Sequence, residues 1–193
     1  LRGRLGIQII RKLGLLLNLK LKHNATILSG GDLVDKPRET RQNEFIMMLN
    51  RYLPNIVGVG GNHSLLYHRL DTIESTTLGV LRDIGRFVLI DDEGHYTNGE
   101  DLIEGFSFGK EIVPSKINCS GKRICVTHQM VFRSENDKLS DYTSGISAKA
   151  LLTKYPEYDL ILTGDNHQTF VEELDGRYLV NPGSFLRLTA SQI

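Results

Sequence analysis

Short apolar runs alternate with longer helical patterns along this chain. Runs of four or five apolar residues, each ending at glycine or a polar residue, predict buried strands at 25–29, 56–59, 87–90, 123–127 and 160–163. Apolar residues at helical spacing predict helices over about 5–17, 38–53, 65–84 and 147–155. Strands that alternate with helices are typical of an α/β protein.

The last third of the chain and a central segment have a different pattern. Residues 95–113 alternate between apolar and polar and contain several glycines, which predicts an antiparallel hairpin. Residues 170–180 predict a second hairpin that turns at Asp175 and Gly176, and the polar segment 133–145 predicts an exposed loop. The predicted fold is therefore an α/β sandwich of two mixed β-sheets flanked by helices, and 193 residues suit a single domain.

Composition narrows the class of protein only slightly. Hydrophobic residues make up 40% and charged residues 24% of the chain, as in ordinary soluble domains, and the formal net charge is zero. Two cysteines, Cys119 and Cys125, are too few for a disulfide framework. Basic residues interrupt the apolar residues of 1–24, so neither a membrane span nor a signal peptide is expected. These features favour a cytoplasmic protein without a membrane partner.

Polar side chains follow four of the predicted strands directly. These side chains are Asp32, Asn62 with His63, His128, and Asp165 with His167. In α/β sheets, ligands bind at the carboxyl ends of the strands, and mixed oxygen and imidazole donors suit Mn, Zn or Fe. Each cluster alone has a structural explanation, since Asp32 could cap a helix and His128 could be a satisfied core histidine. Four successive strand ends of this kind favour a metal centre.

These clusters also resemble known motifs. Residues 31–35 (GDLVD), 61–63 (GNH), 126–128 (VTH) and 164–167 (GDNH) are similar to the GDxxD, GNH, isolated-histidine and GHxH motifs of the calcineurin-like metallophosphoesterases. The matches extend from residue 30 to residue 184. Within that superfamily, GDLVD and the closing segment 179–184 (LVNPGS) most resemble the nuclease subunit of the bacterial SbcCD complex and its phage relatives.

The resemblance implies a role for each matching residue. Asp32 would bridge two divalent metal ions, most readily Mn, with Mg, Fe or Zn as alternatives. Asn62 and His128 would bind the second metal and His167 the first. His63 would protonate the leaving group or stabilise the transition state, and Asp35 would support the site without binding metal. A hydroxide held between the two metals would then attack the phosphorus atom.

The chain departs from the family pattern at two places. No Asp-x-His motif precedes Asp32, although the family's first strand carries one that binds the first metal. We therefore expect a truncated domain over 1–193 that lacks this strand, binds the first metal poorly and has little activity by itself; a degenerate site is the alternative. Asp165 stands where the family has histidine, and we expect it to bind the second metal and to favour harder cations. Alternatively, Asp165 only shapes the turn.

The functional prediction is a metal-dependent phosphodiesterase, specifically a DNA exonuclease or endonuclease of the SbcCD type with a role in DNA repair. The resemblance further implies an ATPase partner with long coiled coils, and a homodimer. A phosphoesterase acting on nucleotides or phosphoproteins is a second interpretation. The third is a non-catalytic protein-interaction scaffold with a degenerate metal site.

Overall fold

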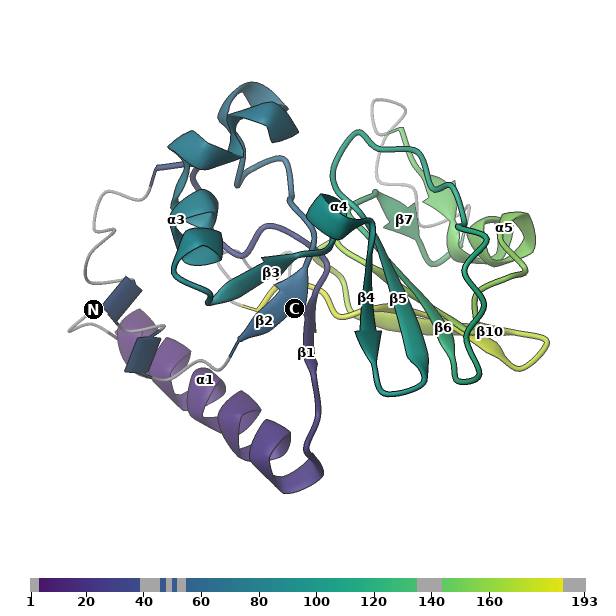
Figure 1. The fold of residues 1–193 in the computed structure, drawn as a ribbon, viewed down its shortest axis with the longest axis horizontal. Helices are drawn as coiled ribbons and strands as arrows, with labels where there is room; N and C mark the ends of the chain where they lie inside the picture. Colours follow the sequence, from purple (N-terminus) through teal and green to yellow (C-terminus); the bar gives the residue numbers. More distant parts are fainter. Residues whose placement is uncertain (1–3, 39–45, 48–49, 52–54, 135–143, 186–193) are drawn as a thin grey trace.

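Two β-sheets form the centre of the molecule (Figure 1). The computed structural model describes residues 4–38, 46–47, 50–51, 55–134 and 144–185. The first sheet is parallel throughout, in the order β1-β2-β3, and consists of β1 (Ile27–Ser29), β2 (Ile56–Gly58) and β3 (Phe87–Leu89). These are three of the five predicted buried strands.

The second sheet is mixed and has the order β10-β11-β9-β6-β5-β4. Its strands are β4 (His95–Asn98), β5 (Asp101–Phe106), β6 (Arg123–Thr127), β9 (Leu160–Thr163), β10 (Phe170–Leu174) and β11 (Arg177–Asn181). The central strands β5, β6, β9 and β11 are parallel, whereas β4 and β10 pair antiparallel at the two edges. A short parallel pair, β7 (Val131–Phe132) and β8 (Ile146–Ser147), lies beside this sheet.

Successive side chains along the strands point to opposite faces of each sheet and so form a layered core. Ile56 packs among helices α1 (Arg4–His23) and α3 (Thr77–Asp83), whereas the next residue, Val57, packs against side chains of the second sheet. In β6, Cys125 faces the cluster that includes helix α5 (Ala148–Lys154), and Val126 faces the first sheet. The sheets therefore pack against each other with helices outside, which confirms the predicted α/β sandwich of mixed sheets.

The predicted helix over 65–84 is wrong. The chain forms two short 3-10 helices, η1 (Leu66–His68) and η2 (Leu70–Ser75), followed by α3. Tyr67 and His68 have positive φ angles of 54° and 57°, which interrupts a right-handed helix. Thr76 then caps α3, because its hydroxyl accepts a hydrogen bond from the Gly79 N–H at 3.2 Å.

Other predicted elements are confirmed, some with different bounds, or fall outside the described residues. The helix expected over about 5–17 is α1, which is longer, at Arg4–His23. α5 and the 170–180 hairpin are confirmed. The central hairpin is confirmed only to residue 106, where β5 ends. Within 38–53, residues 46–47 and 50–51 are helical and most others lie outside the described part of the chain, as do residues 135–143. No helix in the described ranges is long and apolar enough to span a membrane.

Candidate metal centre

The carboxyl ends of β1, β2, β6 and β9 meet where the two sheets adjoin. The Val59 N–H donates to the carbonyl of Ser29 at 3.3 Å and the Gly164 N–H to that of Thr127 at 3.0 Å, so both pairs of strands continue side by side into the loops beyond them. Those loops carry Asp32, Asn62, His128 and Asp165. The site thus lies at the edge that the strand pattern predicted.

His128 connects the two sheets and lies at the middle of the cluster. Its side chain is 1% exposed, and Nδ1–H donates to the carbonyl of Gly30 at 2.7 Å. Nε2 faces Asn62 Oδ1 at 3.0 Å and Asp32 Oδ2 at 3.3 Å. A histidine that donates from one ring nitrogen to a backbone carbonyl holds the other nitrogen ready for a metal, which is the usual arrangement of metal-binding histidines.

Oxygen atoms around the His128 ring favour a positive charge on the imidazole. Burial disfavours the imidazolium, but the Asp32 carboxylate, the Gly30 carbonyl and Asp165 outweigh burial and raise the pKa of His128 above its ordinary value. A cation in place of the Nε2 proton would face the carboxylates of Asp32 and Asp165 but not the Gly30 carbonyl, which is bonded to Nδ1.

Asp32 is held by a strained turn. Its φ angle is 48°, and that of Gly31 is 104°. Asp32 Oδ1 accepts backbone N–H bonds from His63 at 2.9 Å and Ser64 at 3.3 Å, and Oδ2 faces His128. A Cβ at Gly31 would lie 2.2 Å from His128 Nδ1, and one at Gly61 would lie 2.1 Å from Asp32 Oδ1. The glycines of the GD and GNH segments therefore leave room for the side chains that converge here.

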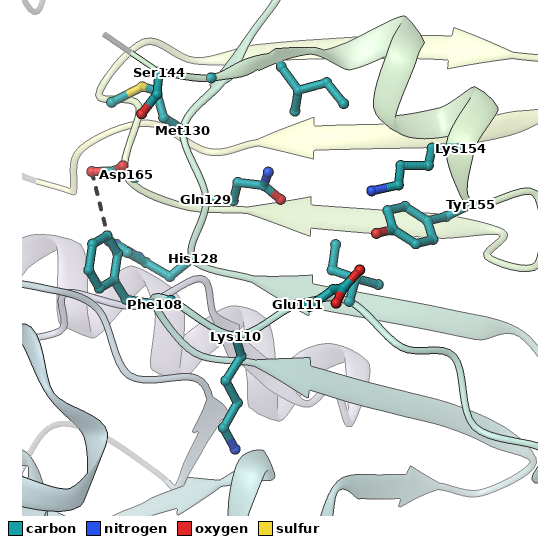
Figure 2. A pocket seen from close by; sticks show the side chains of 14 residues that line it. Phe108, Lys110, Glu111, His128, Gln129, Met130, Ser144, Lys154, Tyr155 and Asp165 are labelled. Carbon is teal, nitrogen blue, oxygen red and sulfur yellow. Dashed lines mark ion pairs between the residues drawn. The ribbon is translucent and has the colours of Figure 1, made fainter. Parts of the chain in front are cut away.

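Asp165 approaches the same imidazole from β9. Its Oδ1 lies 3.9 Å from His128 Nε2 (Figure 2), and its backbone is left-handed with a φ angle of 74°. The next residue, Asn166, is buried and fixes this turn: its side-chain amide donates to the carbonyl of Val131 at 2.7 Å, and its Oδ1 accepts from the Gln168 N–H at 2.9 Å. The turn therefore aims Asp165 at the cluster.

The remaining predicted residues lie around the cluster. His167 lines a cavity of about 370 Å³ together with Asp32 and Asp165, on the side facing α1. His63 is exposed, and its Nδ1 lies 3.6 Å from Asp35 Oδ1, an ion pair when the imidazole is protonated. Asp35 thus contacts the proposed proton donor rather than the cluster, in keeping with its expected supporting role.

The side chains of the cluster are of types that bind divalent cations. Two carboxylates, one amide oxygen and one imidazole nitrogen are the ligands that Mn and similar metals accept. In the described part of the chain, however, no group of three or more His, Cys, Asp or Glu side chains is arranged as a metal site. For a first metal, the predicted ligands among the described residues are Asp32 and His167.

Two side chains beside the cluster were not predicted from the sequence. His68 Nδ1 lies 3.0 Å from the carbonyl oxygen of Asn62, and the Phe108 ring lies between His68 and His128, at centroid distances of 6.1 and 6.2 Å. The position of His68, five residues after the GNH segment, carries no recognisable pattern. Phe108 follows the end of β5 by two residues, and that strand end was the available signal.

Comparisons with known proteins agree with the architecture. The fold is an α/β fold of mixed sheets flanked by helices. TT1561 of Thermus thermophilus has a similar structure, with a TM-score of 0.50 over 91% of this chain and 84% of that one. The two sequences are 16% identical, so the likeness shows the fold alone. No family model matches the sequence, and no curated protein matches it.

Proposed function

We propose that this chain is a metal-dependent phosphoesterase that hydrolyses phosphodiesters, over a single domain. The convergence of Asp32, Asn62 and Asp165 on His128 Nε2 is the observation that carries the proposal. These four residues come from four separate strand ends, and a structural role for each one alone does not explain why their polar atoms meet at one point.

The residues of the cluster would hold a divalent cation and the phosphate beside it. Such a cation supplies Lewis acidity toward phosphate oxygens and lowers the pKa of water. The Gly30 carbonyl orients His128, and the His63 and Ser64 N–H groups orient Asp32, so the ligands are positioned before the cation arrives.

His63 would donate the proton that the leaving oxygen needs. Its side chain is exposed beside the cluster, and its own backbone N–H is bonded to Asp32, which ties the imidazole to the metal ligand. Asp35 Oδ1 lies 3.6 Å from His63 Nδ1, so the carboxylate can orient the imidazole. Proton transfer by a positioned side chain contributes typically about 10²–10⁴-fold to the rate.

DNA is the proposed natural substrate, with a coiled-coil ATPase as partner. Support for this finer assignment comes from the GDLVD segment and from the closing segment at residues 179–184. Two alternatives remain: a phosphoesterase that acts on nucleotides or phosphoproteins, and a non-catalytic protein-interaction scaffold. The following experiment separates them.

Hydrolysis by metal-stripped protein is measured with and without added Mn²⁺, on bis(p-nitrophenyl) phosphate, on end-labelled linear DNA and on a phosphopeptide. We expect slow Mn²⁺-dependent hydrolysis of both diesters, because the first metal has only Asp32 and His167 as predicted ligands among the described residues; Asp32→Asn should abolish it. His63→Gln should lower kcat by about 10²-fold or more. His23→Gln, at the exposed end of α1, is the matched histidine control. Binding of Mn²⁺ without hydrolysis of any substrate would instead support the scaffold.

A further inference from the structure

A cavity of about 530 Å³ extends from the metal cluster toward the end of α5 (Figure 2). His128 and Asp165 belong to its wall at one end, and Lys154 and Tyr155 at the other. The volume lies within the range of about 300–1,000 Å³ that is usual for small-molecule pockets. None of the sequence motifs describes this cavity.

A fixed aromatic ring forms the wall next to the cluster. The Phe108 N–H donates to the carbonyl of Gly60 at 2.9 Å. The preceding Ser107 is held by Asp91, whose Oδ1 accepts from the Ser107 hydroxyl at 2.9 Å and whose Oδ2 accepts from its N–H at 3.2 Å. These hydrogen bonds fix the backbone that carries the Phe108 ring. The ring therefore lies beside His128, where it can stack against a planar group.

The middle of the cavity combines apolar and amide surface. Ile112, Met130 and Ile146 line it, and the Gln129 side chain lies across its centre in Figure 2. Gln129 is exposed, and its amide carries both a donor and an acceptor for hydrogen bonds to a ligand. Apolar side chains beside an amide suit a nucleoside, whose base can stack by its face and hydrogen-bond by its edge; the wall also includes the Glu111 carboxylate.

The far end carries two charged side chains, those of Lys154 and Glu111. Lys154 Nζ lies 5.1 Å from the Tyr155 ring centroid, and among the described residues it forms no ion pair. Lys110, the other lysine of the wall, points away from the cavity in Figure 2 and pairs with Asp91 at 2.8 Å. Lys154 ends α5, so interaction with the helix dipole is its structural explanation. That explanation does not account for its position in the wall of a cavity that reaches the metal cluster.

We propose that this cavity holds the nucleoside adjoining the scissile phosphate, and that Lys154 binds the phosphate on the far side of that nucleoside. The proposal rests on the proposed phosphodiesterase function. The ligand class is a nucleoside with a phosphate on each side, as found within a nucleic-acid strand and in a short oligonucleotide. Phe108 stacks on the base, and Gln129 hydrogen-bonds to its edge.

Three matched dinucleotides test the far phosphate: TpT, pTpT and TpTp. With Mn²⁺ present, one of the two phosphorylated forms should have a KM about fivefold below that of TpT, the upper end for an exposed ion pair. Lys154→Gln should remove this difference and leave the KM for bis(p-nitrophenyl) phosphate unchanged. Lys149→Gln, an exposed lysine on the same helix outside the cavity wall, should keep the difference.

Binding without turnover provides a second measurement. Methyl NMR signals of Ile112 and Ile146 should shift when the same phosphorylated dinucleotide is added to metal-free protein, and Lys154→Gln should weaken the titration. The dependence of KM on oligonucleotide length separates the two sources of the ligand. A further fall in KM for a strand several times longer than the dinucleotide indicates nucleic acid, and no fall indicates a short oligonucleotide.

The outcomes distinguish the two proposals. If no diester is hydrolysed, the proposed function fails. Hydrolysis of all three dinucleotides with equal KM, or a Lys154→Gln effect that is the same for bis(p-nitrophenyl) phosphate, overturns the far phosphate site alone. Preference for a phosphopeptide over every dinucleotide would also overturn it.

Discussion

His128 Nδ1 lies 2.7 Å from the carbonyl oxygen of Gly30, which is 98 residues earlier in the chain. This hydrogen bond joins the end of β6 in one sheet to the end of β1 in the other. It also determines the direction in which Nε2 points, toward Asn62 and Asp32. The geometry of the candidate site therefore depends on how the two sheets pack.

Protonation of His128 should compete with metal binding. Because the pKa of His128 is raised, its contribution to the stability of metal-free protein is full below the ordinary value of about 6.5 and is lost as pH rises through the raised pKa. The thermal midpoint of metal-free protein should thus fall, relative to that of His128→Gln, as pH rises from about 6.5 through the raised pKa of His128. Mn²⁺ affinity should rise over the same interval, as calorimetry can measure. Parallel pH profiles for the two proteins would contradict this.

Gly31 should not tolerate a side chain. Its φ angle of 104° and the 2.2 Å approach of a Cβ to His128 Nδ1 predict that Gly31→Ala loses about 2 kcal/mol or more of unfolding free energy, together with Mn²⁺ binding. Gly14→Ala, in α1 with nothing within 4 Å of the new Cβ, should gain up to about 1 kcal/mol. Urea denaturation measures both, and equal effects would refute the packing argument.

Asp165 should act as a metal ligand. Asp165→Asn keeps the side-chain shape and tolerates the left-handed backbone, but it removes the charge, and Mn²⁺ affinity should fall by at least about tenfold. Asp175→Asn is the matched control, because Asp175 also has a positive φ angle, of 52°, in the turn between β10 and β11. Unchanged affinity in Asp165→Asn would show that this residue only shapes its turn.

The buried ion pair between Glu104 and Arg123 should matter for stability more than for chemistry. Glu104 is 2% exposed, and its Oε2 lies 2.7 Å from Arg123 Nε. Arg123→Met should cost about 3–5 kcal/mol, because it leaves a buried carboxylate unpaired. The double variant with Glu104→Leu should recover most of that loss.

The stability contributed by the Glu104–Arg123 ion pair should depend on pH. Burial would raise the pKa of Glu104, but Arg123 and Ser115 outweigh burial and lower it. The stability that the pair contributes is therefore present above the ordinary glutamate pKa and is lost as pH falls through the lowered value. Acid denaturation curves of wild type and the double variant should converge at low pH; a constant separation would contradict this.

The sequence alone determined the strands and the polar residues at their ends. Period-two and short apolar patterns are local, since they reflect which face of a strand is buried, so β6 and β9 were predicted nearly residue for residue. The α/β class followed from the order of these elements. The clusters at Asp32, Asn62, His128 and Asp165 were also visible, because each directly follows an apolar run.

Tertiary structure decided which of these residues meet and what surrounds them. The break at Tyr67 and His68 accompanies a contact between His68 and the carbonyl of Asn62, which no helical periodicity encodes. Phe108 and Lys154 line one cavity, although they are far apart in the sequence. Such placements depend on strand order and sheet packing, which are long-range properties, so local patterns predicted the donors but not the cavity beside them.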